Sequence, residues 1–435
     1  MSKRALTYLA AGMIVVMSSS SHAAEKYEAR VQKILASSPV IDGHNDLPWE
    51  IRDRFKGDFD KVDLRTDVSA LPHPADLPPL MTDIPRLRRG GVGAQFWSVW
   101  VPADLTGPVA IQTTIEQIDI VARMSARYSD TFARANTVAD IRRAKVDGKI
   151  ASLIGIEGGH QINNQLSVLR QMYDLGARYM TLTHTTNNDW ADSATDNPKY
   201  NGLTLFGKQV VREMNRLGMM VDLSHVSAKT MADALDVTQA PVIFSHSNAR
   251  ALGSHPRNVP DDILVRLKQN GGIVMVNFCS EYLSDAFNNW VANRAGEQAR
   301  LVTPPYAGIY IGQPEKAAEA LAHWDTAHPK PVVTIAQVAD HIDHIVKIAG
   351  VDHVGIGSDF DGTSDLPVGL DSADDYPALF NELLRRGWND GDVAKLSGGN
   401  LLRVMAANER TAARLQQTET PSNARIEDAD ATAKK

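Results

Sequence analysis

The sequence lacks several features that would assign it to a specialised class of protein. Its 435 residues include one cysteine, Cys279, so the chain cannot form an intramolecular disulfide. No block of lysine or arginine stands out, and the formal net charge of -7 disfavours nucleic acid as a partner, because phosphate binding requires a basic surface. With 43% hydrophobic residues, the chain can nevertheless bury a large core. These properties favour a globular protein that binds small molecules.

The N-terminus has the features of a secretory signal peptide. Lys3 and Arg4 precede an apolar stretch over residues 5–17, and small residues around position 23 offer a cleavage site. The stretch is shorter than the roughly 20 apolar residues that a membrane-spanning helix needs, which makes an uncleaved anchor the weaker alternative. We therefore expect a signal peptide over residues 1–23, export to the periplasm or the cell exterior, and no stable membrane anchor after cleavage.

The rest of the chain alternates short β-rich apolar segments with amphipathic helical segments, a pattern typical of a parallel α/β fold. Eight β segments are expected, at residues 39–42, 93–101, 150–156, 179–182, 219–223, 242–244, 273–278 and 353–357. Helices are expected at residues 166–175, 205–217, 263–269 and 335–348, where apolar residues recur every three or four positions. Eight strands with helical crossovers favour a closed (β/α)8 TIM-type barrel, which we assign to residues 24–415.

Two long segments interrupt this repeat. Residues 47–90 are rich in proline, aspartate and arginine. Residues 279–333 are expected to form an ordered lid because they carry four large aromatic side chains, Trp290, Tyr306, Tyr310 and Trp324. We expect these two segments to select the substrate. The last segment, residues 416–435, is polar without apolar periodicity and is expected to be disordered.

Polar motifs follow the expected strands, and in barrel enzymes such positions open on one catalytic face. His44 and Asp46 lie two residues apart after the first strand, so their side chains project together and can reach one metal ion. Glu157 ends the third strand among glycines, and its two oxygens suit a bridge between ions about 3.5–4 Å apart. Taken alone, the first pair could cap a loop and Glu157 could cap a helix.

Matching Ser-His pairs end the fifth and sixth strands, at His225 and His246. Neighbouring strands lie about 4.8 Å apart, so two imidazoles at equal depth can bind one zinc ion at about 2.0–2.1 Å. One such histidine would more often be a core residue, whereas two in the same context favour a metal site. Asp359, after the eighth strand, suits general acid/base catalysis. The alternative role of a turn aspartate fits Asp361 better, because Asp361 precedes a glycine.

Nine motifs, in order, resemble the membrane dipeptidase (renal dipeptidase) family of zinc peptidases. They cover nearly the whole chain after the signal peptide: VIDGHNDLPW at 40–49, TDIPRLRRGGVGAQFWSVW at 82–100, IGIEGGH at 154–160, YMTLTHTTNNDWADS at 179–193, VDLSHVS at 221–227, SHSNARAL at 245–252, RNVPDDIL at 257–264, VMVNF at 274–278 and GIGSDFDG at 355–362. A single motif of this kind would be weak, but nine in sequence are specific.

The resemblance implies a site with two zinc ions and a role for each of these positions. Its metal ligands would be His44 and Asp46 for one ion, His225 and His246 for the other, and Glu157 as the bridge, with Asp359 over the bridging water. His184 would contact the substrate carbonyl or oxyanion, and Arg257 would anchor the substrate. Tyr282 matches a substrate-contacting tyrosine by its distance from Arg257, although the CSEYL stretch around it departs from the family pattern.

These roles combine into the hydrolysis of dipeptides, both L,L and L,D. A hydroxide bridging the zinc ions would attack the peptide carbonyl, His184 would stabilise the oxyanion, and Asp359 would pass the proton to the leaving amine. Arg257 would hold the C-terminal carboxylate and so favour substrates of two residues. Two alternatives remain: a related barrel amidohydrolase acting on another amide, a lactone or a β-lactam, and an inactive binding protein. The resemblance alone suggests a homodimer.

Overall fold

The computed structural model of the protein describes residues 27–74, 77–304 and 308–431. The expected signal peptide, residues 1–23, and Tyr306 of the expected lid lie outside these ranges. In the part of the chain that the structure describes, no helix has both the length and the apolar character needed to cross a membrane.

Parallel strands form the centre of the molecule and close into a barrel. Their order is β2-β1-β9-β8-β7-β6-β5-β4-β3, and an additional pairing between β2 and β4 closes a ring of eight strands. The described strands are β1 (Val40–Asn45), β2 (Val92–Trp100), β3 (Phe132–Arg134), β4 (Ile150–Glu157), β5 (Ala177–Thr181), β6 (Met220–Asp222), β7 (Ile243–Phe244), β8 (Ile273–Val276) and β9 (Val354–Ile356). The predicted (β/α)8 barrel is confirmed.

Eight of these strands correspond to the eight predicted segments, and β3 is the addition. β3 pairs with the first residues of β4. It lies on the same side of β4 as β5, which pairs with the later residues of that strand. Its three residues, Phe-Ala-Arg, contain no β-branched side chain and are too few to show an alternation. The sequence therefore gave no signal for β3.

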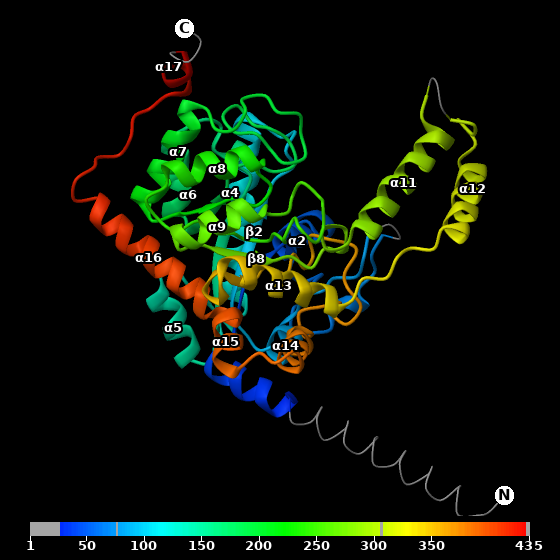
Figure 1. Cartoon of the computed structure of the whole chain (residues 1–435), viewed down its shortest axis with the longest axis horizontal. Helices are drawn as coiled ribbons and strands as arrows, with labels where there is room; N and C mark the ends of the chain where they lie inside the picture. The colour runs from blue at the N-terminus through cyan, green and yellow to red at the C-terminus, as the bar shows by residue number, and fades with distance from the viewer. Residues whose placement is uncertain (1–26, 75–76, 305–307, 432–435) are drawn as a thin grey trace, which may run out of the picture.

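Helices surround the barrel, and the four predicted from apolar periodicity are present as α6, α7, α9 and α13 (Figure 1). In α13 the buried residues Val338, Ile342, Ile345 and Ala349 recur every three or four positions, as an amphipathic helix requires, and Ala339 and His341 are buried beside them. The described helices are α2 (Leu47–Phe55), α3 (Ile84–Arg89), α4 (Gly107–Arg127), α5 (Val138–Val146), α6 (Leu166–Asp174), α7 (Leu205–Leu217), α8 (Ala228–Val237), α9 (Asp261–Asn270), α10 (Ser280–Leu283), α11 (Asp285–Val302), α12 (Pro314–Ala327), α13 (Ile335–Ala349), α14 (Tyr376–Arg385), α15 (Asp390–Ala394), α16 (Asn400–Leu415) and α17 (Ile426–Ala431).

The second long segment forms a helical hairpin. Helices α11 and α12 pack along each other and project away from the barrel (Figure 1). The ring centroids of Trp290 and Trp324 lie 6.1 Å apart across the hairpin, and Trp290 Nε1 donates a hydrogen bond of 2.7 Å to the carbonyl of His328. Two of the aromatic side chains that suggested order, Trp290 and Trp324, therefore hold the two helices together.

The polar C-terminal segment differs from its expected disorder over residues 416–431. The backbone of Ser422 bonds to Arg170 and Glu213, and Asp430 Oδ1 accepts a hydrogen bond of 2.9 Å from the backbone amide of Phe206, at the start of α7. These polar contacts act together with Ala424, Ile426 and Ala429, which pack against the hydrophobic core. Three apolar residues in so polar a stretch form no periodic pattern in the sequence, which explains the difference.

Candidate active site

The polar motifs at the strand ends meet at one end of the barrel around a cavity of about 350 Å³, a size that suits a small-molecule substrate. Eight of the nine predicted site residues line this cavity: Asp46, Glu157, His184, His225, His246, Arg257, Tyr282 and Asp359. The ninth, His44, is fully buried and contacts Asp46 and Glu157. The structure therefore brings all nine together.

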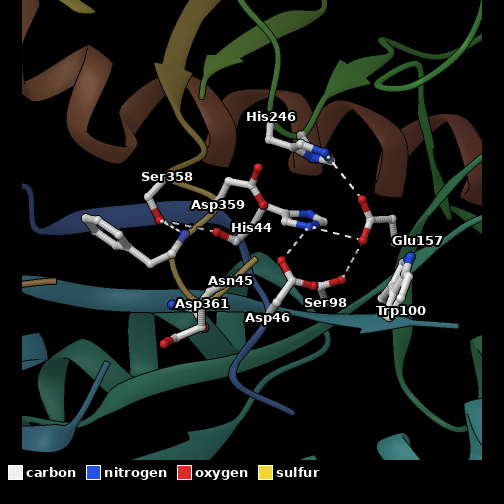
Figure 2. Close-up of polar contacts among 12 residues, drawn as sticks. His44, Asn45, Asp46, Ser98, Trp100, Glu157, His246, Ser358, Asp359 and Asp361 are labelled. Atoms are coloured by element: carbon white, nitrogen blue, oxygen red, sulfur yellow. Dashed lines mark hydrogen bonds and ion pairs between the residues drawn. The ribbon is translucent and has the colours of Figure 1, made fainter. Parts of the chain in front are cut away.

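The Glu157 carboxylate lies between two groups of side-chain nitrogen and oxygen atoms that can bind a metal ion. Figure 2 shows His44, Asp46 and His246 of these groups. Its Oε1 lies 2.9 Å from His225 Nε2 and 3.3 Å from His246 Nε2, and these two nitrogens are 3.0 Å apart. Its Oε2 lies 3.4 Å from His44 Nε2, which is 3.3 Å from Asp46 Oδ2. The nearest Glu157 oxygen thus differs between the two groups, while His44, Glu157 and His246 also lie close enough together to hold one ion.

These separations fit metal coordination. Ligand atoms held about 2.0–2.1 Å from one zinc ion at tetrahedral angles lie roughly 3.3 Å from one another. The measured separations in both groups, 2.9 to 3.4 Å, cluster around that value. Imidazole nitrogens and carboxylate oxygens are also the donor types that zinc prefers.

The hydrogen bonds behind two of the histidines fix which ring nitrogen carries the proton. Ser245 Oγ donates to Asp222 Oδ2 at 2.6 Å, so it can only accept from His246 Nδ1, 2.8 Å away. The hydroxyl of Tyr179 likewise donates to the carbonyl of Gly43 and accepts from His44 Nδ1 at 2.9 Å. The one proton of each neutral ring is therefore on Nδ1, and Nε2 is the atom that faces the carboxylates, where it can bind a cation.

The charge states of the buried histidines agree with a cation site. Burial lowers the pKa of His225 and of His246, with Arg257 and His44 respectively adding to the effect, so both rings are neutral. At His44 burial acts in the same direction, but Tyr179, Glu157 and Asp46 together raise its pKa well above the ordinary value. The carboxylates thus favour positive charge at His44 Nε2, which a metal ion supplies as well as a proton does.

Asp359 lies beside these groups without belonging to the bridge. Its Oδ2 accepts a hydrogen bond of 2.9 Å from Asn277 Nδ2. Burial raises the pKa of Asp359 to about 8; His44 opposes this shift, and Asp46 and Glu157 add to it. A carboxyl group with this pKa can both hold and release a proton near neutral pH.

The backbone is strained at two of these positions. His225 and Asp359 have φ angles of 67° and 65°, in the left-handed region that side-chain-bearing residues rarely adopt. The loop after β9 passes close to Asp46 at Gly362, where a Cβ atom would lie 2.1 Å from Asp46 Oδ2. Only glycine fits at this position. These local geometries aim side chains into the cavity that a regular strand would direct elsewhere.

Two buried acids that the sequence analysis did not single out hold the strand ends in place. Asp42 accepts from the backbone amide and hydroxyl of Ser358 and from Tyr376, and burial raises its pKa. Asp222 accepts from the backbone amide and hydroxyl of Ser245. Each precedes a site histidine by two or three residues, in Asp-Gly-His and Asp-Leu-Ser-His. That spacing is the only sequence signal of this role.

His184 differs from the other histidines in what lies behind its ring. Its Nδ1 accepts a hydrogen bond of 3.3 Å from Trp100 Nε1, and its Nε2 faces Glu157 Oε1 at 3.7 Å. The ring packs on that of His225, with centroids 4.2 Å apart. Burial lowers the pKa of His184, which keeps the ring neutral.

Arg257 is a buried cation at the wall of the cavity, with 2% of its surface exposed. Its Nη1 donates to Ser247 Oγ at 3.3 Å and its Nη2 to the carbonyl of His246 at 3.2 Å. The guanidinium lies over the ring of Tyr282, 5.2 Å from the centroid. No carboxylate neutralises Arg257 among the described residues, so an anion in the cavity would find its charge available.

The cavity wall also contains residues that sequence reasoning missed, namely Trp49, Glu50, Trp100, Thr185, Asp361 and Gly362. Trp49 and Trp100 meet edge to face, with centroids 4.5 Å apart. Glu50 is paired with Arg54, yet burial raises its pKa to about 8. Both expected specificity segments reach the cavity, the first through Trp49 and Glu50 and the second through Tyr282.

Comparisons with known proteins agree with this site. The sequence model of the membrane dipeptidase family (peptidase family M19) matches residues 28–419. The fold is similar to the probable dipeptidase PvdM from Pseudomonas aeruginosa, with 25% identity, a TM-score of 0.72, and coverage of 89% of this chain and 100% of that one. A metallo peptidase from Rhodobacter sphaeroides, solved with a phosphinate mimic of the dipeptide L-Ala-D-Ala, is 22% identical with a TM-score of 0.67 and coverage of 85% and 99%. The chain therefore belongs to the membrane dipeptidase family, peptidase family M19, and is a metal-dependent hydrolase of peptide bonds.

Proposed function

We propose that the protein is a zinc-dependent dipeptidase that acts on L,L and L,D dipeptides and holds two zinc ions. The observation that carries this proposal is the division of the Glu157 carboxylate between two groups of donor atoms spaced for tetrahedral coordination. His44 and Asp46 would hold one ion, His225 and His246 the other, and Glu157 both. When bound, zinc polarises water and the scissile carbonyl, so that hydrolysis proceeds near neutral pH.

In this proposal Asp359 moves the proton. Asp359 lines the cavity, and a carboxylate there can take a proton from the attacking water and give it to the leaving amine. Asn277 donates a hydrogen bond to one of its oxygens and so fixes the orientation of the carboxylate. The strained backbone of Asp359 supports a role that requires a fixed carboxylate.

His184, Arg257 and Tyr282 bind the substrate in the same scheme. His184 donates a hydrogen bond to the carbonyl oxygen as negative charge develops there. Arg257 pairs with the C-terminal carboxylate of the dipeptide, and the ring of Tyr282 supports the guanidinium. A carboxylate anchored at a fixed distance from Glu157 favours substrates with only one residue after the scissile bond. The mimic of L-Ala-D-Ala bound by the Rhodobacter sphaeroides relative supports including L,D dipeptides.

The remaining expectations are also proposals. We propose that residues 1–23 are a signal peptide, that the catalytic domain spans 24–415, and that the mature protein is exported without a stable membrane anchor. Formation of a homodimer remains a prediction from the family resemblance.

The function is tested by metal analysis of the purified protein together with a substrate panel. We expect about two zinc ions per chain and release of free amino acids from L-Ala-L-Ala and L-Ala-D-Ala, with lower activity on an N-acyl amino acid, a lactone and a β-lactam. Preferential turnover of one of the latter would identify a related amidohydrolase instead. A metal-free protein that binds dipeptides without cleaving them would identify a binding protein.

A further inference from the structure

Trp100 occupies a position that no catalytic role explains so far. It is the last residue of β2 and pairs in register with Glu157, the last residue of β4, so the two lie side by side at the barrel rim (Figure 2). The backbone carbonyl of Trp100 accepts a hydrogen bond from Gln117 Nε2, and Trp49 packs edge to face against the indole ring. A side chain held in this way presents its Nε1 in a fixed direction.

That direction leads to His184. Trp100 Nε1 donates to His184 Nδ1 at 3.3 Å, and the two ring centroids are 5.6 Å apart at an interplanar angle of 61°. An indole N–H can donate but never accept, so His184 Nδ1 must be the acceptor. The ring proton of His184 is then on Nε2, the nitrogen that faces the cavity and Glu157 Oε1.

The opposite arrangement holds at His44 and His246. There a hydroxyl group that already donates elsewhere accepts the Nδ1 proton, and Nε2 carries a lone pair. A lone pair on Nε2 can bind a metal ion, whereas an Nε2–H cannot. His184 Nε2, His225 and Glu157 are close enough to hold a metal ion by distance alone, so the partner of Nδ1 decides which chemistry His184 can perform.

We propose that Trp100 is a positioning residue that fixes His184 in the Nε2–H tautomer, making it a hydrogen-bond donor to the substrate and excluding it from the metal ligands. The inference rests on the proposed function for the step that this hydrogen bond serves, the stabilisation of the oxyanion. The tautomer itself follows from the contacts of Trp100 and holds whether or not His184 takes part in catalysis.

The test is nitrogen NMR of the zinc-loaded enzyme with ¹⁵N-labelled histidine, in which the His184 signals are assigned from their loss in His184→Asn. In the wild type we expect a protonated Nε2 and an unprotonated Nδ1. Trp100→Phe keeps the aromatic packing and removes the donor, so the His184 nitrogens should shift toward values averaged between the two tautomers. The matched control is Trp97→Phe, which removes another indole N–H of the same strand, one that bonds Ser152 Oγ and no histidine, and should leave the tautomer unchanged.

Kinetics add a second readout. Trp100→Phe should lower kcat by about tenfold, a part of the roughly 10²–10³-fold loss expected when an oxyanion donor is removed, with KM and zinc content close to wild type. A wild-type spectrum showing a protonated Nδ1, or an unchanged His184 tautomer in Trp100→Phe, would overturn the inference. If the tautomer shifts in Trp100→Phe but His184→Asn keeps full kcat, the role of Trp100 stands and the catalytic role of His184 fails.

Discussion

Two parts of the barrel rim use the same side chain for opposite purposes. On the side of β1 and β7, His44 and His246 are backed by hydroxyl groups and present lone pairs to Glu157. On the side of β2 and β5, His184 is backed by an indole and presents a proton. All three rings approach the same carboxylate. Under the proposed function, the atom behind an imidazole, more than the imidazole's position, would determine whether the ring binds metal or stabilises negative charge.

The largest expected effect comes from removing a histidine whose Nδ1 is hydrogen-bonded to a hydroxyl group. His246→Ala should lose zinc and lower kcat/KM by at least about 10³-fold, because both the ligand and the electrophile that depends on it are lost. Elemental analysis and dipeptide assays on the same preparation measure the two quantities. Full zinc content in this variant would mean that His246 is not a metal ligand.

Removal of His184, whose Nδ1 is bonded to the Trp100 indole, should affect activity but not zinc content. His184→Ala should retain its zinc and lower kcat by about 10²–10³-fold, because only the donor to the oxyanion is missing. Zinc content and kcat, measured beside those of His246→Ala, distinguish a metal ligand from a residue that only contacts the substrate. Loss of zinc from His184→Ala would place this residue among the ligands and erase the distinction between the two sides.

A smaller effect is expected from the group behind a ligand. Ser245→Ala removes the acceptor of the His246 Nδ1 proton and the hydroxyl that bonds Asp222, so zinc affinity should fall by about 10–100-fold. Competition with a zinc chelator measures this affinity. Ser193→Ala is a suitable control, since that hydroxyl bonds the backbone carbonyls of His184 and His225 and no ring nitrogen. An equal loss in both variants would indicate general disruption of the rim.

The last effect is of a different kind and concerns the stability of the metal-free protein. Burial raises the pKa of Asp359 to about 8 in the folded state, whereas the unfolded chain ionises this group near its ordinary pKa of about 3.9. The unfolded state therefore loses the proton first, and this group's contribution to stability is lost as pH rises from about 4 to about 8. Asp359→Asn should flatten that fall, as measured by urea unfolding across this range. An unchanged pH dependence would mean that Asp359 ionises normally in the folded protein.

The strand ends were predictable because each carries its signal within a few consecutive residues. The His-x-Asp pair at 44–46, the paired Ser-His motifs and Glu157 among glycines all follow apolar segments, and the barrel itself places such ends on one face. The fold therefore brought together the residues expected to meet.

What the sequence could not supply were contacts between distant elements. The bond from Trp100 to His184 joins residues 84 positions apart, and that of Ser358 to Asp42 joins residues 316 apart, with no local pattern to reveal either. The partners of Nδ1, and hence the tautomers, depend on such contacts. The same reasoning applies to the C-terminal segment, where Asp430 reaches Phe206 across the surface.

Anomalous X-ray diffraction at the zinc absorption edge would locate the metal ions that we propose Glu157 joins. We expect two zinc peaks about 3.5–4 Å apart. One peak should lie against Glu157 Oε2, His44 and Asp46, and the other against Glu157 Oε1, His225 and His246. Peaks found away from Glu157, or coordinated by His184 Nε2, would contradict this proposal.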